Sequence, residues 1–258
     1  ITNVESIDRY LNTNNPCIII NASGCANVDL CEKNPKTSEK INSMAISILS
    51  KTCKKFEIPL IHFSTDYVFD GVKRIPYQES DSPSPLNEYG KHKLEAENTI
   101  KATLNKYLIF RISWLYGPSK PTFLSLITES AKRVTSLNIV NDQFGTPNSV
   151  DFIAREISYL ITLFKKKKEN IPWGLYHLSN YGETTWFNFA EKISKHSDAK
   201  AKIEPISTDQ YIIKNGIFTK RPYCTVLDSS EYGSAFERHI PSWEDELMKY
   251  FINNSNTK

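Results

Sequence analysis

The sequence lacks a glycine-rich phosphate-binding loop. It has 9 glycines, and none of them falls in a G-x-G-x-x-G or G-x-x-G-x-x-G pattern. Such a loop lets a pyrophosphate approach the N-terminus of a helix, so these residues contain no phosphate cradle of that kind. The chain also starts at Ile1 instead of Met, with a helical pattern that leads into a later strand. We therefore expect the natural protein to carry an earlier strand–helix unit that is missing here.

Cysteine is also scarce, with 5 residues, an odd number, and no C-x-x-C pair. This pattern excludes a disulfide framework and the common zinc sites, and it favours a reducing cytoplasm. No apolar run approaches the roughly 18 residues that span a bilayer. No signal peptide pattern opens the chain. We therefore expect a cytoplasmic protein with no membrane partner and no bound metal.

A large charge of one sign is absent as well. The formal net charge is +3, whereas a nucleic-acid-binding protein usually carries a larger, clustered basic excess. The one basic run, residues 165–168, follows a helical pattern, and we interpret it as a solvated loop. We expect no nucleic-acid partner.

Short apolar runs and amphipathic helical patterns alternate through the chain. This alternation predicts an α/β fold with a Rossmann-type doubly wound parallel sheet that lacks its first strand–helix unit. Ligands collect at the carboxyl ends of parallel strands, where polar or aromatic side chains follow three of these runs. The predicted strands are 17–20, 59–63, 107–112, 137–140 and 174–179, and the predicted helices are 41–49, 88–104, 123–131, 150–164 and 186–193; residues 141–147 read as a loop.

Tyr89 and Lys93 carry the clearest chemical signal. They lie four residues apart at the start of a predicted helix, which places the phenol and the ammonium on one face. A nearby ammonium favours phenolate, so we expect it to lower the pKa of Tyr89. Thr65 ends an apolar run, from which its hydroxyl can reach the same substrate oxygen. A Tyr-x-x-x-Lys pair is often only a surface feature, but this context favours carbonyl–alcohol redox chemistry with a nicotinamide cofactor.

Several other residues have two interpretations from pattern alone. Tyr67, Phe69, Trp114 and Tyr116 suit either a core or the wall of a sugar or nucleotide pocket. Arg221 suits a surface turn or a diphosphate site. Asp142 and Gln143 either fix their loop or touch substrate. His62 and His177 lie inside apolar runs, and packing in the sheet is the favoured interpretation for both.

Seen together, the motifs resemble one family, the dTDP-4-dehydrorhamnose reductases, which are extended short-chain dehydrogenases. The resemblance extends from Asn21 almost to the C-terminus, and its strength lies in the whole set of motifs. The matching segments are Asn21-Ala22 with Val28-Asp29 and Glu32, Ser64 to Gly71, Pro76 to Glu79, Pro85 to Gly90, Arg111 to Tyr116, Asp142 to Pro147, Gly174 to His177 and Arg221-Pro222.

The resemblance implies an NAD(P)H-dependent reduction of the C4 ketone of a dTDP-sugar to dTDP-L-rhamnose, in an enzyme that forms a homodimer. It implies a mainly Rossmann-type domain at 1–180, with 117–149 packing against a mainly nucleotide-sugar-binding domain at 181–258. Tyr89 is the implied proton donor, assisted by Thr65 and Lys93. The implied cofactor contacts are Asn21, Ala22, Ser23, Ser64, Tyr89, Lys93 and Ser113; the implied substrate contacts are Asp66, Tyr67, Trp114, Gln143 and Arg221.

The chain departs from the family pattern at Ser23, Gly24, Cys25 and Ala26, and at Asn148, where threonine is usual. Three alternative functions stay open at this point. The first is reduction of a related 4-keto-6-deoxy sugar nucleotide. The second is a non-catalytic cofactor-binding subunit that resembles the regulatory subunit of methionine adenosyltransferase. The third is an inactive, truncated copy.

Overall fold

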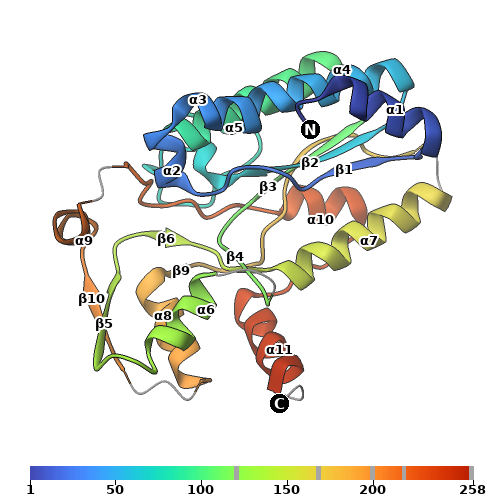
Figure 1. Cartoon of the computed structure of the whole chain (residues 1–258). Coiled ribbons are helices and arrows are strands. Elements are labelled where there is room, and N and C mark those ends of the chain that lie inside the picture. Colours follow the sequence, from blue (N-terminus) through green and yellow to red (C-terminus); the bar gives the residue numbers. More distant parts are fainter. Residues whose placement is uncertain (119–121, 167–169, 198–200, 217–218, 256–258) are drawn as a thin grey trace.

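A parallel sheet forms the centre of the structure (Figure 1). The computed structural model describes residues 1–118, 122–166, 170–197, 201–216 and 219–255. The sheet has the order β1-β2-β3-β8, with Asn21 paired to His62 and Thr65 paired to Ile112. The predicted α/β fold with a parallel sheet is confirmed. Its strands are β1 (Ile19–Asn21), β2 (Leu60–Thr65), β3 (Tyr107–Ile112) and β8 (Gly174–His177).

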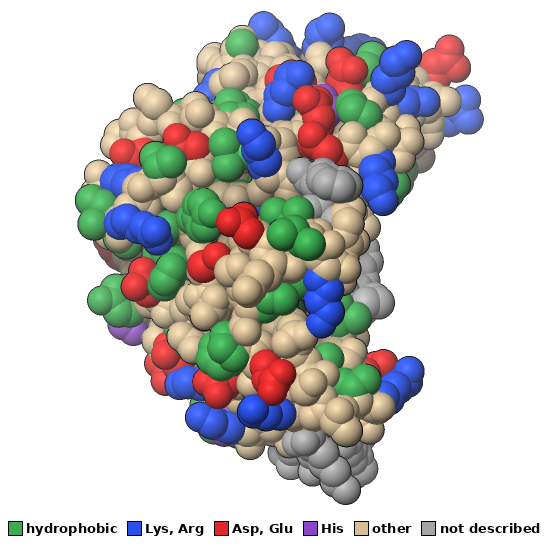
Figure 2. All heavy atoms as spheres, turned by 90° about the vertical axis from the view of Figure 1, so that its left-hand side faces the viewer, with side chains coloured by type: hydrophobic (Ala, Val, Ile, Leu, Met, Phe, Trp, Pro, Cys, Tyr) green, Lys and Arg blue, Asp and Glu red, His purple; other side chains and the backbone are tan. Residues whose placement is uncertain are grey.

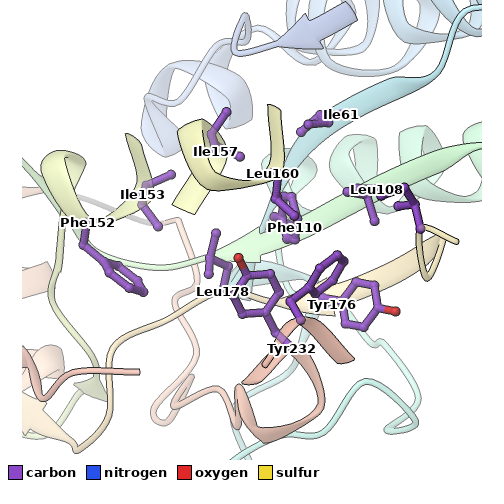
Figure 3. Packing of buried hydrophobic residues seen from close by; sticks show 12 residues of the cluster. Ile61, Leu108, Phe110, Phe152, Ile153, Ile157, Leu160, Tyr176, Leu178 and Tyr232 are labelled. Atoms are coloured by element: carbon purple, nitrogen blue, oxygen red, sulfur yellow. The ribbon is translucent and has the colours of Figure 1, made fainter. Parts of the chain in front are cut away.

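Helices cover both faces of the sheet, because successive strand residues point to opposite sides. Leu60 and Ile109 pack against the face formed by α4 (Ala45–Phe56) and α5 (Glu88–Thr103). Neighbouring strand residues face the other way, toward α7 (Val150–Lys166) and α10 (Ser230–Phe236). Figure 3 shows this second cluster, in which strand, α7 and α10 side chains meet; its labelled members include Ile61, Leu108, Phe110, Ile153, Ile157, Leu160 and Tyr232.

The N-terminal helices are more numerous than the sequence predicted. The predicted helix 41–49 is part of a longer run of α3 (Pro35–Glu39), a π turn (Lys40–Met44) and α4. A π turn inserts one extra residue into a helix and has no hydrophobic periodicity of its own, so the pattern could not reveal it. The helical pattern at the start of the chain is confirmed as α1 (Val4–Asn14), which packs on α4, whereas α2 (Val28–Lys33) was not predicted.

A second group of elements lies below the sheet in Figure 1. Its core joins side chains of α6 (Phe123–Ser130), α8 (Trp186–Lys195) and α11 (Trp243–Ser255). Two parallel strands, β5 (Ser136–Val140) and β10 (Lys202–Ile206), pair beside them. Helix α9 (Thr208–Asn215) follows β10, and a parallel pair, β4 (Leu115–Tyr116) with β7 (Asn148–Ser149), leads to α7.

The segment 141–147 is only partly a loop. Phe144–Gly145 forms β6, which pairs antiparallel with β9 (Thr184–Thr185). Two-residue strands give too little alternation to be recognised in a sequence. Side chains cap two helices: Thr185 accepts a hydrogen bond from the Asn188 amide, and Ser242 accepts one from the Asp245 amide.

The surface carries interspersed charges. Figure 2 shows acidic and basic side chains mixed over the face that it presents. Lys165 and Lys166 of the basic run end helix α7, and the other two lysines of that run fall outside the described residues. Within the described ranges, no helix is both long and apolar enough to cross a membrane.

Candidate active site

A cleft of about 480 Å³ opens at the carboxyl ends of β1, β2 and β3. Its wall brings together most of the residues that the sequence singled out. The predicted catalytic and cofactor residues in the wall are Ala22, Ser23, Ser64, Thr65, Tyr89, Lys93 and Ser113, and the predicted substrate residues are Asp66, Tyr67 and Trp114.

Thr65 and Tyr89 lie together in the wall of this cleft. Thr65 ends β2, and its side chain caps the following turn by accepting a hydrogen bond from the Tyr67 amide at 3.1 Å. Asn87 caps α5 in the same way by accepting from Gly90. A Cβ added at Gly90 would lie 2.2 Å from the Tyr67 carbonyl oxygen. Only glycine therefore allows α5 to start close enough to bring Tyr89 to Thr65.

The pKa of Tyr89 differs from the sequence expectation. Burial raises it above its usual value, the hydrogen bond with Thr65 opposes this in part, and the Asp66 charge adds to the increase. The predicted lowering by Lys93 is thus wrong for this structure. Lys93 does not lower the pKa of Tyr89 because its ammonium donates a hydrogen bond to the Phe63 carbonyl oxygen instead of pairing with the phenol. Tyr89 therefore keeps its proton at neutral pH.

Lys93 is almost completely buried on α5, beneath the cleft. Its Nζ lies 3.3 Å from Nε2 of His62, a residue in the middle of β2. Burial lowers the pKa of Lys93 to about 8, although the charge of Glu97 acts in the opposite direction. Lys93 is therefore a group that changes its charge close to neutral pH.

The loop after β1 forms another part of the wall. Asn21 accepts hydrogen bonds at Oδ1 from both the backbone and the hydroxyl of Ser23. Further along, the Asn42 side chain accepts from the Cys25 amide and donates to the Cys25 carbonyl. Asn42 lies in the π turn, so that turn fixes the loop that contains the family departures. Gly24 fits beside Asn42, with its added Cβ 3.2 Å from Oδ1.

Ser64 and Ser113 line the cleft, but their hydroxyls are engaged elsewhere. Ser64 donates to Glu97 on α5. Ser113 donates to the Thr146 carbonyl oxygen and accepts a hydrogen bond from Asn148. Asn148 also accepts a hydrogen bond from the Asn180 amide. The residue that departs from the family pattern here is therefore buried, and its hydrogen bonds join the segment after β3 to the segment after β8.

Asp66 and Tyr67 form the turn that follows Thr65. Burial raises the pKa of Asp66 to about 6, although hydrogen bonds from Thr225 and Thr65 oppose this. The Tyr67 ring packs edge-on against Tyr89, with centroids 6.1 Å apart. By contrast, Phe69 is a core residue that stacks on Tyr77.

A second cavity of about 400 Å³ adjoins the cleft, and Tyr67, Phe123 and Trp186 line both. Its wall is largely apolar and comes from α6, β5 and α9. Arg221 lies in this wall and pairs with Asp29 at 2.9 Å. An apolar pocket with one guanidinium suits a base and an anionic group.

The segment 142–143 serves two purposes. Asp142 accepts hydrogen bonds from both the amide and the hydroxyl of Thr208, so it fixes the start of α9. Gln143 also donates to the Thr208 hydroxyl, but it lines the second cavity.

Trp114 lines the cleft and stacks on Trp186, which lines both cavities. Tyr116, two residues later, is fully buried in the second core. The position of Trp114 resolves its two interpretations in favour of the cleft wall. The wall residues that the sequence did not single out as site residues include Asp29, Asn42, Phe123 and Trp186; of these four, only Asp29 lay in a recognised motif.

The comparisons with known proteins agree with this geometry. The family model of the RmlD substrate binding domain matches residues 1–256. This chain belongs to that family. It is 31% identical over 246 residues to the dTDP-4-dehydrorhamnose reductase of Salmonella typhimurium, covering 94% of this chain and 81% of the relative.

Solved structures of family members are similar throughout. The dTDP-4-dehydrorhamnose reductase of Bacillus anthracis, solved in complex with NADP, gives a TM-score of 0.90 at 30% identity, with 98% of this chain and 86% of that chain covered. The Clostridium acetobutylicum reductase gives 0.88 at 30% identity, with the same coverage. The Rossmann-type fold expected for this chain is thus confirmed.

The residues present fit one end of the dinucleotide that the Bacillus anthracis family member binds. Lys93 and Tyr89 place an amine and a phenol in a cleft at the strand ends, the edge of a parallel sheet at which dinucleotides bind. The sequence given has no glycine-rich loop for the pyrophosphate. Among the described residues, no cluster of three or more His, Cys, Asp or Glu side chains is placed to hold a metal.

Proposed function

We propose that this chain catalyses the NAD(P)H-dependent reduction of the C4 ketone of dTDP-4-dehydro-6-deoxy-L-mannose to dTDP-L-rhamnose. The observation that carries the proposal is that Tyr89, Thr65 and Lys93 line one cleft at the strand ends. The comparisons support the proposal because the Salmonella and Bacillus anthracis relatives are both named dTDP-4-dehydrorhamnose reductase.

In the proposed mechanism, the ketone oxygen lies against Tyr89 and Thr65. The bound dinucleotide supplies a hydride to C4. Tyr89 gives its phenolic proton to the oxygen, and the carbonyl becomes an alcohol. The raised pKa of Tyr89 keeps the phenol protonated before the reaction. Lys93, with its pKa of about 8, is the nearby source of a replacement proton.

We assign the nucleotide part of the substrate to the second cavity. Arg221 offers a guanidinium for the diphosphate, and Gln143 lies in the same wall. The sugar then lies between Tyr67 and the Trp114–Trp186 stack, with its ketone toward Tyr89. This assignment gives the second group of elements, which includes α8, β10, α9 and α11 of the segment 181–258, the role of a substrate domain, whereas α10 of that segment packs on the central sheet.

The test uses the full natural chain with the 4-keto sugar nucleotide, and it monitors oxidation of NADPH or NADH. Tyr89→Phe should reduce kcat by about 100-fold or more, the usual contribution of a general acid, while the variant still binds cofactor. Tyr10→Phe, at an exposed tyrosine, is the matched control. Near-normal turnover in Tyr89→Phe would contradict the proton-donor role.

Identification of the product by NMR separates this reaction from reduction of a related 4-keto-6-deoxy sugar. Absence of any substrate-dependent oxidation by the full natural chain would overturn the proposal and favour a cofactor-binding subunit. The homodimer and the cytoplasmic location stay predictions, which light scattering and cell fractionation test. All five cysteines are free thiols in the structure, which supports a reducing compartment.

A further inference from the structure

A chain of buried polar contacts links Lys93 to the loop that follows β1. Lys93 Nζ lies 3.3 Å from His62 Nε2, and His62 Nδ1 lies 3.0 Å from Asn21 Nδ2. Asn21 Oδ1 in turn accepts from the Ser23 amide at 3.1 Å. His62 is fully buried, and Asn21 and Lys93 are nearly so. Buried polar groups need hydrogen-bond partners, so each of these side chains must donate to or accept from the next one in this series of contacts.

The Ser23 amide determines the orientation of the Asn21 side chain. A backbone N–H can only donate, so the atom that it meets must be the side-chain oxygen of Asn21. The Ser23 hydroxyl meets the same oxygen at 2.6 Å. The NH₂ group of Asn21 is then the atom that faces His62, and it donates to Nδ1.

An acceptor at Nδ1 fixes the protonation state of His62. A neutral imidazole that accepts at Nδ1 carries its hydrogen on Nε2, and an imidazolium accepts nowhere. Burial, together with the Lys93 charge, lowers the pKa of His62 well below its usual value, which agrees with a neutral ring. The Nε2–H therefore points at Lys93 Nζ.

This orientation favours one form of Lys93. A neutral amine has a lone pair that can accept from Nε2–H, whereas an ammonium has only donors. Two ionisable groups act on Lys93 from the elements around it: His62 on β2 and Glu97 on α5. Glu97 favours the ammonium, but Arg111 and Ser64 already occupy its carboxylate oxygens.

We propose that His62 is a positioning residue for the reductase reaction: locked in one tautomer by Asn21 and Ser23, it donates its Nε2–H to Lys93 and stabilises the uncharged amine. This inference rests on the proposed function for its kinetic consequence alone. Because Lys93 Nζ contacts His62 and the Phe63 carbonyl instead of the phenol, its proton reaches the Tyr89 phenolate through water in the cleft; the products are a neutral amine and a phenol. His62 lowers the free energy of that amine, so it makes Lys93 a reusable proton source instead of a permanent cation.

The first experiment needs no activity. Acetylation of Lys93 by acetic anhydride is followed against pH by mass spectrometry, with exposed Lys91 on the same helix as the internal reference. The comparison covers the natural protein and His62→Phe, His62→Gln and Asn21→Asp. His62→Gln keeps an acceptor for Asn21 and an N–H donor for Lys93. Asn21→Asp keeps the shape of the side chain but accepts from Nδ1–H, which moves the lone pair of His62 to Nε2.

We expect the titration midpoint of Lys93 to rise by about one pH unit in His62→Phe and in Asn21→Asp, because the donor to the amine is lost. His62→Gln should keep the natural midpoint, and Lys91 should be unchanged throughout. An unchanged Lys93 midpoint in Asn21→Asp would overturn the proposal. That variant decides the outcome even where His62→Phe fails to fold.

The second experiment measures kcat against pH in the full natural chain. In Asn21→Asp, the basic limb of the kcat profile should move to higher pH by the same number of pH units as the Lys93 midpoint. A midpoint that moves while the limb does not would overturn the kinetic role. Failure of the proposed function would instead appear as absent turnover in the natural protein, with the midpoint shifts still present.

Discussion

Trp114 and Trp186 stack face to face in the wall of the cleft, with ring centroids 3.5 Å apart and planes inclined by 7°. Trp114 has a left-handed backbone with φ of 40°, which is strained for a bulky residue. A Cβ at Gly145 would lie 2.3 Å from the Trp114 ring, so a glycine makes room for this arrangement. The stack therefore holds an unfavourable backbone conformation at the place where the sugar is proposed to bind.

Trp186→Ala should remove the partner of Trp114 and raise KM for the sugar nucleotide more than it lowers kcat. It should also lower the free energy of unfolding by about 1–2 kcal/mol, since an aromatic pair and partly buried area are lost. Steady-state kinetics and urea unfolding measure the two effects. Trp173→Ala, which loses an aromatic contact with Phe164 on the far side of the molecule, should be destabilised without a change in KM.

Gly90→Ala should lower both stability and turnover. The new Cβ would lie 2.2 Å from the Tyr67 carbonyl, so α5 must move away from the Thr65 turn and take Tyr89 with it. We expect a loss of about 2 kcal/mol in unfolding free energy and a fall in kcat. At Gly174 the nearest atom to an added Cβ is 3.6 Å away. If Gly174→Ala proved equally damaging, the steric explanation would be wrong.

Glu97→Gln should destabilise the protein strongly. Glu97 and Arg111 are both fully buried, and two hydrogen bonds join their side chains. Removing one charge leaves the other unpaired in the interior, at a loss of about 3 kcal/mol. Replacing both partners with Leu and Met should recover most of that loss. A double-mutant cycle by urea denaturation measures this coupling, and the exposed pair Asp8–Lys55 is the control with little effect.

Glu79 should make stability depend on pH. Burial raises the pKa of this carboxyl to about 7, even though the His177 amide donates a hydrogen bond to it. The folded chain thus binds this proton more tightly than the unfolded chain, so stability falls as pH rises from about 4.5 to about 7. Glu79→Gln should remove that decline from thermal unfolding curves, whereas the exposed control Glu5→Gln should retain it.

The regular elements could be predicted closely from the sequence. Strand 107–112 was found with its observed bounds, and helix 88–104 ends one residue earlier in the structure. Both are long enough to show their periodicity. Helix α2, the π turn and strand β6 were missed because each depends on a cap, an inserted residue or a distant partner.

Site residues that lie at the end of a strand or at the start of a helix were predictable from the sequence. Thr65 ends a strand and Tyr89 starts a helix, so their meeting followed from the topology. The direction of each side chain was harder to predict. Ser64 and Thr65 are neighbours on a strand and point to opposite faces, and Ser64 therefore meets Glu97. The wall residues Asn42, Phe123 and Trp186 come from other segments, which no local pattern connects to the cleft.

The two hydrogen bonds between Asn42 and the Cys25 peptide have a thermodynamic consequence. They tie both backbone polar groups of Cys25, which belong to two successive peptide units, to a long helical run, so the loop has little conformational freedom left to lose. A ligand that enters the cleft meets a wall that is already ordered, and the entropy of ordering this segment was lost during folding. The free energy of its contacts is therefore available for affinity.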